Sequence, residues 1–149
     1  MIEHAMTVTV KRVYDSPDQG DGTRVLVDRL WPRGLKKDQA ALDAWLRDLA
    51  PSDDLRKWFH QNLSAWATFR KRYLKELTRP EAQESLDKLY GLAHGRARLT
   101  LLYASKNTER NNATVLRDLL NGMRKPPTGT GPAGAKMARQ RQAKRMPRR

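Results

Sequence analysis

The sequence predicts a small α/β domain: a mostly parallel sheet of about three strands with helices packed around it, followed by a disordered C-terminal tail. Three observations favour this fold class. Short runs of β-branched and aliphatic residues occur at 7–13, 23–27 and 99–104, as expected for strands. Most apolar residues between the second and third runs recur at helical spacing. The third run is followed by a polar loop and a further helical pattern, which is the repeating unit of parallel α/β sheets.

The first half of the domain is expected to contain two strands and one helix. Residues 14–22 join the first two strands and contain Pro17 and two glycines, so they form a loop. Because this loop is short for a helical crossover, the two strands either pair directly or lie apart in the sheet. A first helix is predicted from residue 37 or 38 to 49, because apolar side chains recur there at helical spacing: Leu42, Trp45, Leu46 and Leu49.

Four more helices are predicted from their start and stop signals. Ser52 can cap a helix that ends near residue 61, and the two aspartates after it favour the positive end of the helix dipole. A third helix is predicted to begin at Ser64, and a fourth has Pro80 in its first position. The last helix is expected over about 110–121, with Gly122 directly after it.

The net charge of +14 is distributed unevenly along the chain. Residues 124–149 carry nine Lys and Arg and no acid, which leaves 21 basic against 16 acidic residues, a surplus of +5, in 1–123. Proline and glycine interrupt the basic segment, and it lacks the apolar residues that would stabilise a fold. We therefore expect a flexible leader (1–6), with either Met1 or Met6 as the true start, an α/β domain (7–122) and a disordered basic tail (123–149).

Several classes of function find no support in the composition. Cysteine is absent, so there is no disulfide, no cysteine-ligated zinc and no thiol nucleophile. The three histidines are scattered, so neither a metal site nor a cofactor is predicted. No apolar run is long enough to cross a membrane, and the N-terminus lacks a signal-peptide core, so we expect a cytoplasmic protein without a membrane partner. The G-x-G-x-x-G match at 129–134 contains Pro132 and lies in the tail, outside any strand–helix unit, so it is not a dinucleotide site.

The strongest candidate for a site is the segment 25–34, V-L-V-D-R-L-W-P-R-G, in which a strand is followed at once by charged and aromatic residues. Ligands of open α/β sheets bind beyond the carboxyl ends of the strands. Arg29 or Arg33 is expected to bind a phosphate or carboxylate, Trp31 to stack on a planar group, and Asp28 to position the arginines or act as acid–base. Lys106 and the start of the last helix would complete an anion cradle. The predicted ligand-binding set is Asp28, Arg29, Trp31, Arg33, Lys106, Asn107 and Asn111.

The same residues also fit a structural interpretation. Asp28 would pair with an arginine to lock the loop, Trp31 would plug the core, and Lys106 would be solvated. His60 fits either a general base or a solvated residue at the end of a helix. Five further aromatic side chains could stack on nucleic-acid bases, but most of them recur at core-facing helical positions, so we interpret most of them as core: Trp45, Trp58, Phe59, Trp66 and Phe69.

Several motifs resemble the YeaO-like branch of the domain-of-unknown-function 488 (DUF488) family. They are K-R-V-Y-D at 11–15, R-V-L-V-D-R-L-W-P-R-G at 24–34, L-A-P-S-D-D-L-R-K-W-F-H at 49–60 and L-L-Y-A-S-K-N at 101–107, with Asn111 after them. The resemblance covers about 7–121 and implies a compact cytoplasmic bacterial α/β domain, but it supplies no activity. Arg110 stands where members of the family tend to have histidine.

Two functions of different classes follow from the sequence, and whether the protein is an enzyme stays open, as does its oligomeric state. The first is binding of a small anionic ligand, bearing phosphate or carboxylate, at the carboxyl ends of the strands. The second is non-catalytic association with nucleic acid, in which a basic arm contacts phosphates without reading the base sequence. A solubilising tail without a dedicated partner is the alternative for that arm. Its predicted contact residues are Lys136, Arg139, Arg141, Lys144, Arg145, Arg148 and Arg149.

Overall fold

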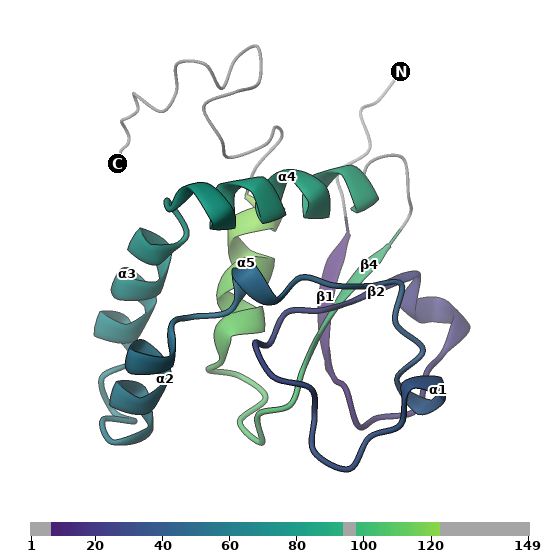
Figure 1. Cartoon of the computed structure of the whole chain (residues 1–149), viewed down its shortest axis with the longest axis horizontal. Coiled ribbons are helices and arrows are strands. Elements are labelled where there is room, and N and C mark those ends of the chain that lie inside the picture. Colours follow the sequence, from purple (N-terminus) through teal and green to yellow (C-terminus); the bar gives the residue numbers. More distant parts are fainter. Residues whose placement is uncertain (1–6, 94–97, 123–149) are drawn as a thin grey trace.

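Four parallel strands form the centre of the molecule in the computed structural model, which describes residues 7–93 and 98–122 (Figure 1). The expectations for the leader 1–6 and for the tail 123–149 lie outside the described residues. The strands are β1 (Val8–Arg12), β2 (Thr23–Leu26), β3 (Ala44–Trp45) and β4 (Leu99–Tyr103), and their order across the sheet is β1-β4-β2-β3. The α/β class and the parallel sheet are therefore confirmed, with one strand more than the three expected.

The central strand of the sheet is the last one in the sequence. Leu101 of β4 lies opposite Val10 of β1 on one side and opposite Val25 of β2 on the other. Of the two arrangements that the short loop after β1 left open, the strands thus lie apart, with β4 inserted between them. Because every pair is parallel, the carboxyl ends of all four strands meet at one edge of the sheet.

Four longer helices surround the sheet: α2 (Asp53–His60), α3 (Trp66–Glu76), α4 (Pro80–Ala93) and α5 (Asn112–Asn121). Ser52 caps α2 as predicted, since its Oγ accepts a hydrogen bond from the Leu55 N–H at 3.1 Å. Pro80 occupies the first position of α4, also as predicted. The third helix begins at Trp66, two residues later than expected. No helix in the described ranges is long and apolar enough to cross a membrane.

The single helix predicted over 37–49 is wrong. Only α1 (Lys37–Ala40) is helical there, because Ala41 adopts a left-handed conformation with φ of 48° and ends it. The chain then pairs with β2 as β3, where the Leu46 N–H donates to the Leu26 carbonyl at 2.9 Å, and a 3₁₀ turn η2 (Arg47–Leu49) follows. Consecutive residues of an edge strand point to opposite faces, so the apparent helical spacing arose from two separate core clusters.

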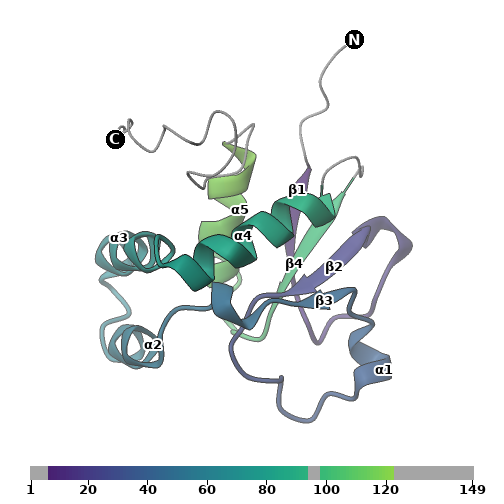
Figure 2. The ribbon, with the colours of Figure 1, turned by 45° about the horizontal axis from the view of Figure 1, so that its top comes forward.

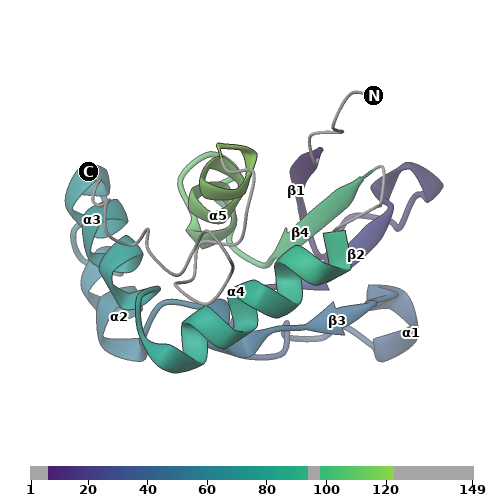
Figure 3. The same ribbon diagram turned by 90° about the horizontal axis from the view of Figure 1, so that it is seen from above.

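The two faces of the sheet are covered differently. On one face, Val25, Leu101 and Tyr103 join the main core with buried residues of α3, α4 and α5, including Tyr73 and Leu116. Figures 2 and 3 show α2 and α3 side by side at the end of the molecule away from β1. On the other face there is no long helix among the described residues. A smaller cluster lies there, formed by Val13, Leu26 and Leu102 with Trp31, Leu35, Leu42, Trp45 and Ala104.

A buried ion-pair cluster also lies on the face of the sheet that carries the smaller core cluster. Arg24 is only 4% exposed and donates to the Asp21 carboxylate, to the Ala40 carbonyl at 2.7 Å and to the Ala41 carbonyl at 3.1 Å. Lys11 Nζ lies 3.1 Å from the same carboxylate. Burial alone would raise the pKa of Asp21, but the hydrogen bonds from Lys11, the backbone and Arg24 lower it overall. The cluster therefore ties β1, β2 and the end of α1 together.

Candidate functional site

Asp28 connects three elements at the carboxyl edge of the sheet. Its carboxylate accepts hydrogen bonds from the Ala104 N–H at 2.8 Å and from the Asn112 side-chain amide at 3.2 Å. Its backbone carbonyl accepts a bond from the Trp45 indole at 2.8 Å. No arginine pairs with it among the described residues. Burial raises the pKa of Asp28, and the bonds from Ala104 and Asn112 oppose that rise. The Asp28–arginine pair of the structural interpretation is therefore not formed.

The Trp31 side chain lies over the smaller core cluster. Its indole N–H donates to the Leu35 carbonyl at 2.6 Å, and its ring meets the Trp45 ring edge-on at 5.4 Å. Both rings are half-buried against Leu26 and Leu102. The ring thus covers the smaller core cluster, as the structural interpretation expected.

Asn107 and Asn111 shape the loop between β4 and α5. The Asn107 side-chain oxygen accepts from the Glu109 and Arg110 N–H groups at 3.0 and 2.9 Å. Asn111 is buried and caps α5, accepting from the Thr114 N–H at 3.0 Å and donating to the Asn107 carbonyl at 2.7 Å. These two side chains are therefore engaged in local structure.

Two residues that the sequence did not single out bring the loops of Arg33 and Lys106 together. The Tyr14 hydroxyl donates to the Arg33 carbonyl at 2.8 Å, and the Arg12 guanidinium lies 5.1 Å from the centre of the Tyr14 ring. Arg12 also donates to the carbonyls of Ala104 and Ser105, both at 3.0 Å. The exposed side chains of Arg33 and Lys106 therefore lie at the same edge of the sheet, as expected from parallel strands.

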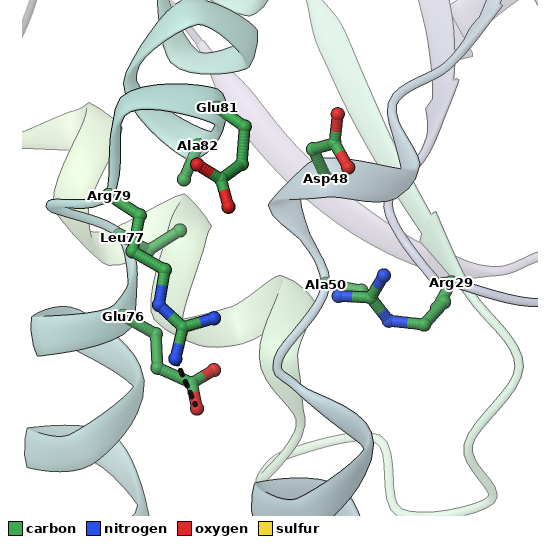
Figure 4. Close-up of a pocket in the computed structure, with 8 residues that line it drawn as sticks. All are labelled: Arg29, Asp48, Ala50, Glu76, Leu77, Arg79, Glu81 and Ala82. Carbon is green, nitrogen blue, oxygen red and sulfur yellow. Dashed lines mark ion pairs between the residues drawn. The ribbon is translucent and has the colours of Figure 1, made fainter.

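The Arg29 side chain points into a separate pocket of about 170 Å³ (Figure 4). The pocket is formed by the segment after β2, by η2 and the residue after it, and by the junction of α3 and α4. Arg29 Nε is buried and has no hydrogen-bond partner in the described part of the chain. Of the predicted ligand-binding residues, only Arg29 lines this pocket; the others that line it are Asp48, Ala50, Glu76, Leu77, Arg79, Glu81 and Ala82.

The charges around the pocket are only partly paired. Glu76 accepts hydrogen bonds from the Ser52 N–H at 2.7 Å and the Ser52 hydroxyl at 2.6 Å, and lies 3.8 Å from an Arg79 nitrogen. By contrast, the side chains of Arg29, Asp48 and Glu81 form no hydrogen bond or ion pair within the described ranges. No pattern in the sequence marks Asp48 or Glu81 as pocket residues, because acids in the first turn of a helix commonly interact with the helix dipole.

A broader groove of about 870 Å³ runs between α2 and α3, adjacent to this pocket through Glu76 and Arg79. Trp58 lies in it, with the Arg72 guanidinium 4.4 Å from the centre of the indole ring. His60 is exposed at the end of α2 and does not line either cavity. In the part of the chain that the structure describes, no group of three or more His, Asp or Glu side chains could hold a metal ion.

Fold and pocket define a small parallel α/β domain with a charged pocket beside the carboxyl ends of β2 and β3. Within that class, the chain belongs to the DUF488 family: the family model described as "Inactive DUF488-N3 subclade" (DUF488-N3i) matches residues 7–131. The family predicted from the motifs is thereby confirmed. Residues 132–149, which carry seven of the nine basic residues of the tail, lie beyond the match.

Similar proteins occur in distant bacteria. The chain is 48% identical over 118 residues to the uncharacterised protein YeaO of Escherichia coli strain K12, which covers 79% of this chain and all of that protein. It is 43% identical over 115 residues to the uncharacterised proteins Rv3073c of Mycobacterium tuberculosis H37Rv and Mb3100c of Mycobacterium bovis, covering 77% of this chain and 94% of each. No solved structure matches the chain significantly.

Proposed function

We propose that this protein is a non-catalytic binding domain that holds a small carboxylate-bearing molecule in the Arg29 pocket. The observation that carries the proposal is the Arg29 side chain, which lines the pocket and forms no hydrogen bond or ion pair within the described residues. Its Nε is shielded from solvent, so the two terminal nitrogens of the guanidinium are the donors that a ligand oxygen would reach. A guanidinium also presents paired N–H groups that match the two oxygens of a carboxylate.

The place and size of the pocket support a small ligand. Arg29 and Asp48 follow the carboxyl ends of β2 and β3, where open α/β sheets bind their ligands. Pockets for drug-sized molecules measure about 300–1,000 Å³. The volume of about 170 Å³ favours a molecule smaller than a nucleotide.

Two observations support the absence of catalysis. The matching family model is itself described as an inactive subclade. In addition, Asp28, the buried carboxylate offered as an acid–base, uses both oxygens in hydrogen bonds and does not line the pocket. The proposal includes a cytoplasmic location, with which the absence of cysteine is compatible.

A ligand screen on the full chain tests this function. Thermal unfolding is followed with acetate, propionate, butyrate, their amino-acid analogues, inorganic phosphate and glucose 6-phosphate. We expect small carboxylates to raise the unfolding temperature of the wild type and of the control variant Arg33→Gln, whose side chain is exposed outside the pocket. Arg29→Gln should lose the shift. The proposal is wrong if no carboxylate raises the unfolding temperature of the wild type. It is also wrong if carboxylates raise the unfolding temperature of Arg29→Gln by as much as that of the wild type.

We propose as a second candidate that the basic tail associates with nucleic acid. The supporting observation is the run of nine Lys and Arg without an acid over 124–149. If five of these charges reach phosphates of duplex DNA, log K should fall with log salt at a slope of about −4.5. Titrating the full chain and a chain ending at Met123 against a duplex of arbitrary sequence tests this. Equal affinity and equal slope for both chains would refute it.

A further inference from the structure

We infer that the Arg29 pocket selects a zwitterion, a molecule carrying an ammonium group on a short carbon chain beside its carboxylate. This inference rests on the proposed function and adds the identity of the second charged group. Its basis is the pair of acids, Asp48 and Glu81, which line the same pocket and have no partner within the described ranges.

The balance of charge disfavours a ligand that is only an anion. Two guanidinium groups and three carboxylates line the pocket, a net charge of −1. Glu76 and Arg79 pair with each other at 3.8 Å, and Glu76 is also held by Ser52, so this pair is already satisfied. What is left is one free guanidinium and two free carboxylates. Phosphate, with up to two negative charges, would be repelled by the carboxylates at short range.

The positions of the free groups suit a ligand that bridges them. Figure 4 shows Glu81 and Arg79 on the α3–α4 side of the pocket and Asp48 and Arg29 on the opposite side. Among the residues that the structure describes, none of these free charges lies within ion-pair distance of an opposite charge. A carboxylate on Arg29 would place an ammonium group within the field of Asp48 and Glu81. Both ends of such a ligand would then form charge-assisted hydrogen bonds.

The size of the pocket favours a short link between the two charged groups. Ala50, Leu77 and Ala82 also line the pocket, but they are buried and expose little apolar surface to it. A volume of about 170 Å³ leaves room for only a few methylene groups beside the two charged ends. The ligand class is therefore a small amino acid with a short chain between its two charged groups.

Isothermal titration of the full chain with three matched ligand pairs tests the inference. The pairs are glycine and propionate, β-alanine and butyrate, and 4-aminobutyrate and pentanoate, in which a methyl group replaces the ammonium group. We expect at least one amino acid to bind about tenfold or more tightly than its partner, as one extra charge-assisted hydrogen bond allows. The double variant Asp48→Asn, Glu81→Gln should lose this preference and keep carboxylate binding. Asp87→Asn, an exposed acid of α4 that does not line the pocket, should retain the preference.

Each outcome separates the inference from the function on which it rests. Equal binding of both members of every pair overturns the zwitterion inference and leaves carboxylate binding intact. A preference for amino acids that survives in the double variant also overturns it, because the ammonium group would then be recognised elsewhere. Failure of all six probes to bind refutes the proposed function itself. Equal unfolding temperatures of wild type and variants without ligand confirm that each variant is folded.

Discussion

Replacing Arg24 by methionine should destabilise the protein by about 3 kcal/mol, because it opens a buried ion pair. Arg24 is 4% exposed, and its guanidinium bonds the Asp21 carboxylate and two carbonyls, one of them the buried Ala40. Loss of one partner of a buried pair costs about 3–5 kcal/mol, and the lower end applies because Lys11 still bonds Asp21. The Ala41 carbonyl belongs to an exposed residue and can bind water instead.

Urea denaturation and calorimetry on the full chain measure this loss. A loss of 3 kcal/mol corresponds to a fall of about 12 °C in Tm for a domain of this size. The matched control is Arg56→Met, which opens the Arg56–Asp53 pair, with side chains 43% and 54% exposed, and should cost less than about 1 kcal/mol. The reasoning is refuted if the two variants lose equal stability, since burial would then not determine the cost of opening a pair.

Three further predictions concern the stability of the domain. Asn111→Ala should lower the free energy of unfolding, measured by urea denaturation, by about 1 kcal/mol, because it removes the N-terminal cap of α5. An unchanged free energy of unfolding would show that the cap contributes nothing. Gly22→Ala should lower the free energy of unfolding by more than the ~1–3 kcal/mol expected from backbone strain at φ of 67°. The additional loss is expected because a Cβ would lie 2.3 Å from the Arg98 carbonyl oxygen. A soluble, fully stable variant would contradict this. The pKa of Asp28 is raised, so its neutral form stabilises the fold below about pH 4, and that stabilisation is lost as pH rises through the folded pKa. Asp28→Asn should remove this decrease in the free energy of unfolding as the pH rises above about 4. If the free energy of unfolding depends on pH in the same way in both proteins, the prediction is wrong.

Much of the fold could be predicted because local signals and tertiary structure agree. Ser52 and Pro80 mark helix starts through the backbone geometry of the first turn, which depends on few distant contacts. The helix predicted after Lys37 was wrong because the apolar spacing of a helix also fits an edge strand in which consecutive residues face two different core clusters. Pairing of Leu46 with Leu26 across the sheet decided the outcome, and no local pattern encodes that contact.

The candidate site was predictable only in part. Arg29 was identified because it follows a buried strand, a position that parallel sheets make accessible to ligands. Asp48 and Glu81 lie 19 and 52 residues further along the chain, and nothing near them in sequence marks them as lining residues. Tyr14 was equally inconspicuous, although its bond to the Arg33 carbonyl brings two loops together. Such long-range convergence depends on the crossing of α3 and α4 beside the sheet rather than on any motif.

The most direct test of carboxylate binding at Arg29 is the nuclear magnetic resonance signal of its Nε–H group during titration with β-alanine and with butyrate. The signal is assigned in the full chain by its absence in Arg29→Lys. We predict that it shifts in a saturable manner, because a carboxylate bound to the terminal nitrogens of the guanidinium changes the electronic environment of the neighbouring Nε–H group. The Nε–H signal of Arg12, which already donates to the Ser105 carbonyl at 3.0 Å, should stay unchanged. An Arg29 signal that does not move at saturating concentrations of either probe would contradict the proposed binding site.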